Sequence, residues 1–214
     1  LVQPGGKERL LHYVSHYKPE LGEHAADYSL DPHAWVAKVH KLKSHYYRRY
    51  LRMGLVPLRP GVARLIREAD AAGINVALVS NASRASLRPV LRYGLGDDLA
   101  ERIDLVVSGE DVSAKKPAPD TYLLALKKLG LQASECVALE DSDIGLRAAH
   151  AAGVATVVTT NSNTEGQDFS DAVMVLDGCG DPDQPAKPFR GVMSDPFLTL
   201  AHLRGFTDVG STAV

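Results

Sequence analysis

Residues 138–153 read ALEDSDIGLRAAHAAG, and this stretch joins the end of an apolar run to the start of a helix. The run begins at Cys136 and stops at two adjacent carboxylates, Glu140 and Asp141. Side-by-side acids at the end of a buried strand repel each other and lose hydration. A hard cation such as Mg²⁺ relieves both effects, because it prefers carboxylate oxygens. The alternative is that Asp141 and Ser142 only cap the following helix, which explains one acid better than two.

Short apolar runs rich in β-branched residues recur along the chain and alternate with helical patterns. The expected strands are residues 74–80, 103–107, 136–140, 154–158 and 173–176, and the expected helices between them are residues 84–93, 119–129 and 142–152. Near-continuous apolar strands that alternate with helices predict an α/β fold with a parallel sheet covered on both faces. Ligands bind beyond the carboxyl ends of such strands, so the polar residues just after each strand are the candidates for a site.

Residues 1–53 differ, because they show helical periodicity and no strand pattern. The longer expected helix begins at Asp31 and stops at Gly54. Its apolar residues recur at three- and four-residue steps, which predicts one apolar stripe made of Trp35, Val39, Leu42, Tyr46 and Tyr50. We therefore predict two domains, a small helical domain at residues 1–53 and an α/β core at residues 54–214.

Composition excludes several classes of partner. The 214 residues are 45% hydrophobic, which is enough apolar material for one globular core. A net charge of -2 gives no basic excess, so we expect no nucleic-acid or membrane partner. The basic run HKLKSHYYRRYLR at residues 40–52 is interpreted as a solvated helix face. Cys136 and Cys179 cannot form a disulfide framework, which favours a reducing compartment.

Two loops carry candidate site residues besides the paired acids. Ser80, Asn81, Ala82 and Ser83 follow the expected strand at 74–80, and small hydroxyl and amide donors at a helix start suit an anion. The alternative for this loop is plain helix capping by Ser80 or Ser83.

The second loop holds Lys116 just ahead of Pro117 and Pro119, whose stiff backbone could aim the ammonium at a phosphate. The alternative is a solvent-exposed lysine in a loop. Taken together, a hydroxyl and amide cradle, a cation and a metal carboxylate are the parts needed for phosphoryl transfer, apart from a nucleophile.

These groups stand in the order of motifs II, III and IV of the haloacid dehalogenase (HAD) superfamily phosphatases: Ser80-Asn81, Lys116-Pro117 and Glu140-Asp141-Ser142 with Gly145. The phrases KKPAPDTY and ALEDSDIGLRAAHAAG resemble that superfamily almost residue for residue. The phrases GGKERL, LVPLRPGVARLI and GDPDQP resemble its CbbY-like branch, including plant and algal members, whose bacterial relatives dephosphorylate xylulose-1,5-bisphosphate. The resemblance implies a Rossmann-like parallel-sheet core with a small helical cap.

The resemblance also implies roles for individual residues. Ser80 and Asn81 would hold the transferring phosphoryl group, and Lys116 would offset charge on its oxygens. Asp141 would bind Mg²⁺, with Glu140 as its neighbour or second ligand. The remaining positions would contact the substrate, from the cap or from the loop after residue 80: Gly5, Gly6, Lys7, Glu8, Arg9, His40, Lys43, Ala82 and Ser83.

The motif that defines the superfamily, a strand ending in Asp-x-Asp-Gly-Thr, does not occur in these 214 residues. It would supply the aspartate nucleophile and the aspartate acid/base. In the superfamily its strand lies between the strands expected here at 74–80 and 136–140, so we expect those two to be separated by a gap or to pair directly. Because the sequence starts at Leu1, we expect the natural protein to begin upstream.

Two hypotheses follow for function. In the first, the intact protein is a Mg²⁺-dependent phosphatase of a small sugar phosphate or bisphosphate that works through an aspartyl-phosphate. A β-phosphoglucomutase-like mutase and a phosphoglycolate phosphatase are alternatives within that enzyme class. In the second, the chain is a non-catalytic module that binds phosphate or metal. We expect a monomer in the plastid stroma or the cytoplasm, and no phosphatase turnover from the 214-residue chain by itself.

Overall fold

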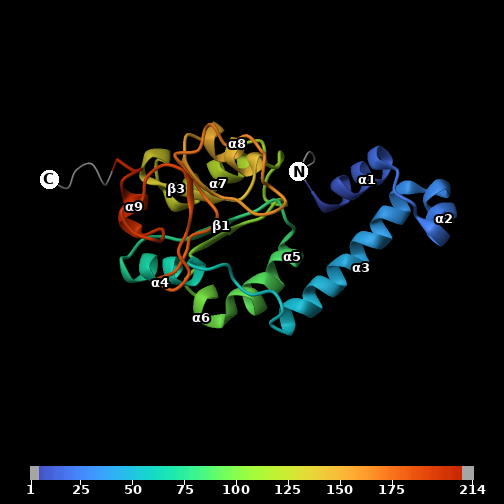
Figure 1. Cartoon of the computed structure of the whole chain (residues 1–214), viewed down its shortest axis with the longest axis horizontal. Coiled ribbons are helices and arrows are strands. Elements are labelled where there is room, and N and C mark those ends of the chain that lie inside the picture. The colour runs from blue at the N-terminus through green and yellow to red at the C-terminus, as the bar shows by residue number, and fades with distance from the viewer. Residues whose placement is uncertain (1–4, 209–214) are drawn as a thin grey trace.

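Three helices lie together at one end of the molecule, beside an α/β core (Figure 1). The computed structural model describes residues 5–208. The three helices are α1 (Gly6–Tyr17), α2 (Ala25–Leu30) and α3 (Pro32–Arg52), with a 3₁₀ turn at Gly22–His24. Asp31 caps α3 by accepting a hydrogen bond from the amide of Ala34 at 2.9 Å, as the sequence predicts. Among the described helices, none is both long enough and apolar enough to cross a membrane.

The apolar stripe predicted along α3 is only partly buried. Val36 and Leu51 are the buried residues of this helix, and α1 contacts α3 with Val14 buried. Leu42 and Tyr46, which the periodicity places on the inner face, are exposed, as is Tyr50. The stripe is therefore apolar in sequence as predicted, but these three side chains are not buried, although α3 also contacts α5 (Arg84–Pro89) and the π-helical segment Val90–Leu95.

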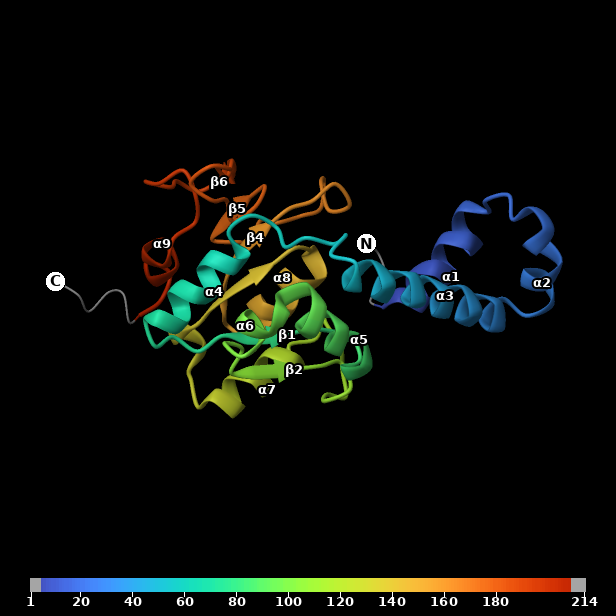
Figure 2. The same cartoon turned by 90° about the horizontal axis from the view of Figure 1, so that it is seen from below.

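The core contains two separate sheets instead of the single sheet expected (Figure 2). In one, β1 (Ala77–Val79) pairs in parallel with β2 (Leu105–Val107). The other has the order β3 (Val137–Glu140), β4 (Ala155–Thr159), β5 (Met174–Leu176) and β6 (Pro188–Arg190). Its first three strands are parallel and β6 is antiparallel. All five strands expected from the sequence are confirmed, whereas β6 has only exposed residues and gave no apolar pattern.

The break between the sheets falls where the sequence predicts a strand to be missing. The strand β1 lies within the range expected at 74–80, and the strand β3 lies within the range expected at 136–140. They belong to different sheets, so the described chain leaves a gap between them instead of pairing them directly.

Helices cover the core on several sides. They are α4 (Val62–Ala71), α5 (Arg84–Pro89), α6 (Gly96–Ala100), α7 (Asp120–Leu129), α8 (Asp143–Ala151) and α9 (Leu200–Arg204), with a 3₁₀ turn at Ala133–Glu135. The helix expected at 84–93 changes at Pro89 into a π-helical segment, Val90–Leu95. Proline has no amide hydrogen to donate, so the regular α-helical ladder cannot continue through it.

The sheet around β4 is packed on both faces. Val157 belongs to a buried cluster with Leu65 of α4 and Leu198 of the C-terminal segment. The next residue, Val158, points to the opposite face, where it packs with Leu146 of α8. Alternating residues of β4 thus contact helices on opposite sides, as the continuous apolar pattern predicts.

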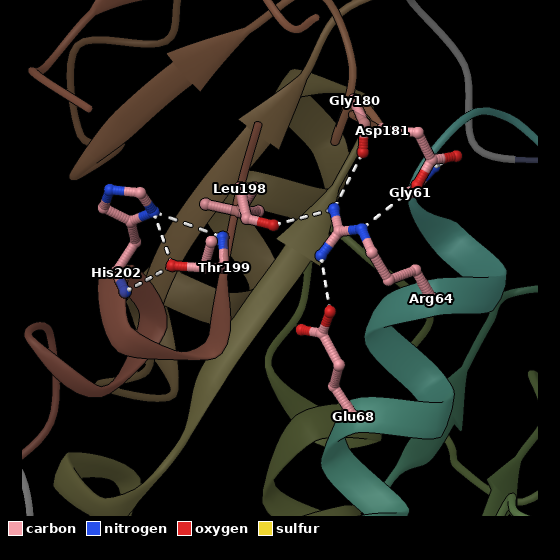
Figure 3. Close-up of polar contacts among 8 residues, drawn as sticks. All are labelled: Gly61, Arg64, Glu68, Gly180, Asp181, Leu198, Thr199 and His202. Carbon is pink, nitrogen blue, oxygen red and sulfur yellow. Dashed lines mark hydrogen bonds and ion pairs between the residues drawn. The ribbon is translucent and has the colours of Figure 1, made fainter. Parts of the chain in front are cut away.

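Arg64 of α4 fixes the C-terminal segment to the core (Figure 3). Its guanidinium donates to Asp181 Oδ1 at 3.0 Å, and to the carbonyl oxygens of Gly180 and Leu198 at 2.8 and 2.9 Å. It also pairs with Glu68 at 3.0 Å, and its side chain is 18% exposed. In the same segment the Thr199 hydroxyl accepts from the amide of His202 and caps α9.

We predict that Arg64→Lys destabilises the chain by about 2 kcal/mol, because a lysine ammonium cannot reproduce the forked set of charge-assisted hydrogen bonds. Urea unfolding followed by circular dichroism measures the change. The matched control is Arg67→Lys on the same helix, whose ion pair with Asp98 is exposed and should cost less than about 0.5 kcal/mol. Equal losses from the two substitutions would contradict this role for Arg64.

Candidate active site

A buried ion pair joins the carboxyl ends of β1 and β3. The ammonium of Lys116 donates to Glu140 Oε1 at 2.6 Å and to the carbonyl oxygen of Val79 at 2.9 Å. The side chains of Lys116 and Glu140 are 7% and 10% exposed. Lys116 is therefore the group that neutralises Glu140, and it links two strands that share no ladder.

Tyr122 of α7 completes the environment of this pair. Its hydroxyl donates to Glu140, and its ring lies beneath the Lys116 ammonium, 4.6 Å from nitrogen to ring centroid. Burial raises the pKa of Tyr122 well above its ordinary value, and the Glu140 charge raises it further. The phenol therefore stays protonated and acts as a hydrogen-bond donor at any physiological pH.

Asn81 positions the backbone that carries Lys116. Its side-chain oxygen accepts from the amide of Lys116 at 2.8 Å, and its side-chain nitrogen donates to the carbonyl of the same residue at 3.0 Å. A Cβ on Gly109 would lie 2.3 Å from the carbonyl oxygen of Asn81, so only glycine permits this close approach. The sequence predicted that Asn81 holds a phosphoryl group. That role stays a prediction, and the structure adds a positioning role that sequence reasoning missed.

The serines of the candidate loops lie at local turns. Ser80 Oγ accepts from the amide of Ala82 at 3.1 Å. Ser83 caps α5 by accepting from the amide of Ser86 at 3.3 Å, so the capping interpretation is confirmed for Ser83. Ser142 likewise caps α8.

The two adjacent acids have different surroundings. Glu140 points inward. A Cβ on Gly145 would lie 1.9 Å from Glu140 Oε2, so Gly145 makes room for this carboxylate. Asp141 is exposed, lines a hollow at the surface, and has no hydrogen-bond partner within residues 5–208. The pair therefore divides into one internally neutralised acid and one acid open to a ligand.

The hollow beside Asp141 lies between the helical end and the core and has a volume of about 560 Å³. Its cap side is lined by Gly6, Arg9, Leu10, Val39, His40 and Lys43, and its core side by Asp141, Asn161 and Asn163. Asn161 and Asn163 were missed by sequence reasoning, although they follow the carboxyl end of β4, where the same strand-end rule applied.

The structure brings together only some of the predicted site residues. Gly6, Arg9, His40 and Lys43 meet Asp141 around the hollow. The others do not line it: Gly5, Lys7, Glu8, Ser80, Asn81, Ala82, Ser83, Lys116 and Glu140. Gly5 has φ +104°, a region that favours glycine, and the Glu8 carboxylate lies against it. The ring of His40 lies against Gly6, where a Cβ would come within 2.6 Å of Nε2.

The cap side of the hollow is cationic. Partial burial lowers the pKa of His40 below its ordinary value, and the nearby charges of Lys43 and Lys7 lower it further, against the opposing effect of Glu8. The clustering of these cations is unfavourable in the free protein and would be relieved by a bound anion.

The donors for a metal are carboxylates at the end of β3. Within residues 5–208 no group of three or more histidine, cysteine or acidic side chains is placed to hold a metal ion. Asp141 and Glu140 supply oxygen ligands of the kind Mg²⁺ prefers, and Asp141 is open to the hollow. The donor chemistry fits a hard cation, although the described residues alone do not complete a ligand set.

The fold and this site define a hydrolase of the haloacid dehalogenase type, and comparison with known proteins agrees. The profile of the haloacid dehalogenase-like hydrolase family matches residues 6–153. The chain belongs to this family of hydrolases. The family includes phosphatases, which is the enzyme class that the groups of this site indicate.

Within the family the chain resembles CbbY proteins. It is 41% identical over 202 residues to the plasmid-encoded CbbY of Cupriavidus necator, covering 94% of this chain and 78% of the relative. It is 38% identical over 178 residues to a CBBY-like protein of Arabidopsis thaliana, covering 83% of this chain and 55% of the relative. Crystal structures of Rhodobacter sphaeroides CbbY with phosphate, and of a variant with xylulose-1,5-bisphosphate, superimpose with TM-scores of 0.68 and 0.67. Both are 34% identical to this chain, covering 83% and 82% of it and 75% and 73% of the CbbY chains.

We predict that Lys116→Met destabilises the chain by about 3 kcal/mol, because it leaves the Glu140 carboxylate buried without its cation. Adding Glu140→Leu to Lys116→Met should restore part of the loss, since the double variant has no buried charge at this position. Urea unfolding of the two single variants and the double variant measures this coupling. If the double variant loses the sum of the single effects, the ion pair is not the link proposed here.

We predict that His40 titrates below 6.5, its ordinary pKa, in the folded chain. The folded state then binds this proton less tightly than the unfolded state, so His40 makes stability rise with pH in the window just below 6.5. Lys43→Gln should raise the His40 pKa by removing a nearby cation, whereas Lys41→Gln on the same helix should change it little. The His40 Hε1 chemical shift followed against pH measures both. A midpoint at or above 6.5 in the unsubstituted chain would contradict the arrangement.

Proposed function

We propose that this chain is the larger part of a Mg²⁺-dependent phosphatase that hydrolyses a sugar bisphosphate similar to xylulose-1,5-bisphosphate. The observation that supports it is the hollow with cations on the cap side and Asp141 on the core side. A bisphosphate carries anionic groups at both ends and needs cations at both. The structures of CbbY with phosphate and with xylulose-1,5-bisphosphate support the same substrate class by similarity.

In this proposal the two phosphates occupy different ends of the site. The reacting phosphate lies toward Ser80 and Asp141, where Lys116 contributes positive charge. The second phosphate lies on the cap side, where Arg9 and Lys43 neutralise it. Guanidinium and ammonium groups both bind phosphate, and the guanidinium does so in a bidentate manner.

Asp141, with Glu140 as its neighbour, is the proposed holder of Mg²⁺. When bound there, the ion would supply positive charge to the phosphoryl oxygens. Glu140 already accepts hydrogen bonds from Lys116 and Tyr122. Its role beside Asp141 is therefore to orient the metal site and to balance its charge.

The nucleophile of the proposed reaction lies outside these 214 residues. An aspartate carboxylate attacks phosphorus, the P–O bond to the sugar breaks, and the leaving alkoxide takes up a proton from a second acid. Water then attacks the aspartyl-phosphate and releases inorganic phosphate, which restores the carboxylate. Of the acids at this site, Glu140 is held by Lys116 and Asp141 is assigned to the metal, so neither is available for attack.

Proteins of other phosphoryl-transfer activities are also similar to this chain. The chain is 29% identical over 182 residues to phosphoglycolate phosphatase of Salmonella typhimurium. It is 27% identical to a Thermotoga maritima protein described as a putative β-phosphoglucomutase, with a TM-score of 0.55. The cap-side cations favour a bisphosphate over glycolate phosphate, because the far group of glycolate phosphate is a singly charged carboxylate one carbon from the ester oxygen and not a second phosphate. We further propose a monomer, in a plastid stroma or the cytoplasm.

We predict that Arg9→Ala and Lys43→Ala, in a protein that includes the Asp-x-Asp segment, raise KM for xylulose-1,5-bisphosphate at least about tenfold each, by removing charge-assisted hydrogen bonds to the second phosphate. The KM for a hexose monophosphate, which has no second anionic group, should change little. Lys41→Ala is the matched control, since this exposed lysine lies on the same helix and does not line the hollow.

The measurement is phosphate release from a panel of ketose bisphosphates, hexose phosphates and phosphoglycolate, with Mg²⁺ and with EDTA. Activity with phosphoglycolate that exceeds activity with every bisphosphate would overturn the substrate assignment. Full activity in EDTA would overturn the metal assignment. Absence of turnover with the whole panel, in a protein with its Asp-x-Asp segment, would favour the non-catalytic binding module.

A further inference from the structure

Two asparagines, Asn161 and Asn163, form a neutral polar part of the wall around the hollow. They lie in the loop directly after β4, on the core side. In the proposed function Arg9 and Lys43 of the cap side meet a phosphate, and Asp141 of the core side meets the metal. The two amide side chains line the same hollow and have no role in that assignment.

The loop turns back on itself and leaves most of these amide groups free for a ligand. Asn161 Oδ1 accepts from the amide of Asn163 at 2.9 Å, and Thr164 Oγ1 accepts from the amide of Asn161 at 3.0 Å. Thr164 is fully buried, and its own amide donates to the Asn161 carbonyl oxygen at 2.9 Å, so the turn is fixed from inside. Within residues 5–208, Asn161 Nδ2 and the whole side-chain amide of Asn163 have no hydrogen-bond partner.

The free groups specify the chemistry of the ligand. An asparagine side chain has two N–H donors and one carbonyl acceptor. Because Asn161 Oδ1 is used in the turn, the groups left for a ligand are the Nδ2 donors of both residues and Oδ1 of Asn163. A hydroxyl group both donates and accepts, so it satisfies such a mixed set, whereas an ionised phosphate oxygen only accepts. The loop therefore matches hydroxyl groups better than it matches phosphate.

Two long-range contacts hold this loop beside the rest of the site. Before it, Arg59 of the segment between α3 and α4 donates to the carbonyl oxygens of Thr159 and Thr160 at 3.1 and 2.7 Å. After it, the side-chain oxygen of Gln167 accepts from the amide of Asp143, the first residue of α8, at 2.9 Å. The loop is thus tied to the connection between the helical end and the core, and to the helix that follows the paired acids. Binding groups that are held in place beforehand lose little entropy when a ligand arrives.

We propose that Asn161 and Asn163 recognise hydroxyl groups on the carbon chain between the two phosphates, an inference that rests on the proposed function. That function places one phosphate toward the core side and the other on the cap side, so the carbon chain crosses the hollow between them. A site built to hydrogen-bond hydroxyl groups rejects an analogue that lacks them, because its polar groups are then left unpaired. The loop thereby selects a polyhydroxylated bisphosphate over an alkyl bisphosphate of the same length.

The test compares xylulose-1,5-bisphosphate with pentane-1,5-diol bisphosphate, in a protein that includes the Asp-x-Asp segment. The second compound has the same two phosphates on five carbons and no other oxygen. Asn163→Ala should lower kcat/KM for xylulose-1,5-bisphosphate at least about tenfold, as expected from the loss of one hydrogen bond to a hydroxyl group. The inhibition constant of pentane-1,5-diol bisphosphate, measured against the same reaction, should change less than about twofold, because it has no hydroxyl group to lose.

Ser162→Ala is the matched control, because Ser162 is exposed in the same loop and does not line the hollow. It should leave both constants unchanged. Asn163→Ala should also leave the melting temperature unchanged, since its side chain has no partner in the described part of the chain. Equal losses with the two compounds in Asn163→Ala, no loss with xylulose-1,5-bisphosphate, or an equal loss in Ser162→Ala would each overturn the inference.

This inference and the phosphatase proposal fail on different observations. Turnover of xylulose-1,5-bisphosphate with equal losses for the two compounds overturns the role of the asparagines and leaves the phosphatase proposal standing. Absence of turnover with this substrate overturns the phosphatase proposal, and calorimetric titration of both bisphosphates in Mg²⁺ then decides the inference. Weaker binding of the hydroxylated compound alone in Asn163→Ala supports it, whereas unchanged binding, or no binding of either compound to the unsubstituted protein, overturns it.

Discussion

The buried ion pair between Lys116 and Glu140 is the contact on which the site depends. It bridges two sheets that have no shared ladder, and it does so at the ends where ligands of parallel sheets bind. Removing two charges from water costs several kcal/mol each, so the pair is favourable only where further hydrogen bonds satisfy it. Val79 and Tyr122 supply those bonds, and Asn81 holds the backbone of the lysine in place. The site is therefore assembled from three loops whose positions depend on one cation.

The ion pair also explains why two adjacent acids can end a buried strand. Successive side chains of a strand point to opposite faces, so Glu140 and Asp141 need not share one environment. Glu140 turns inward, where Lys116 neutralises it, and Asp141 faces the hollow. The repulsion that suggested a metal for both acids is thus relieved for one of them by the protein itself, and only Asp141 is left facing the hollow as a ligand.

Much of the fold could be predicted from the sequence, because apolar runs and glycine stops mark strands and helix ends directly. The site could be predicted less well. Asn81 was recognised as a polar residue after a strand, but its bonds to the backbone of Lys116 depend on a contact 35 residues away that no local pattern records. Asn161 and Asn163 were missed because residues 160–163, directly after β4, show no periodicity and no charged side chain. The exposed stripe on α3 shows a different limit, since periodicity predicts an apolar face and cannot supply the partner that covers it.

Two features of the described chain point to the same conclusion by independent routes. The stripe of Leu42, Tyr46 and Tyr50 is apolar at helical spacing, yet it is exposed. The strands β1 and β3 are apolar except for Glu140 at the end of β3, as interior strands are, yet in the described residues each pairs on one side only. A surface strand would be expected to alternate polar and apolar residues, and a surface helix face would be expected to carry charges. The residues at both places are instead apolar, although the described residues leave Leu42, Tyr46 and Tyr50 exposed and pair β1 and β3 on one side only, so residue type alone does not predict burial.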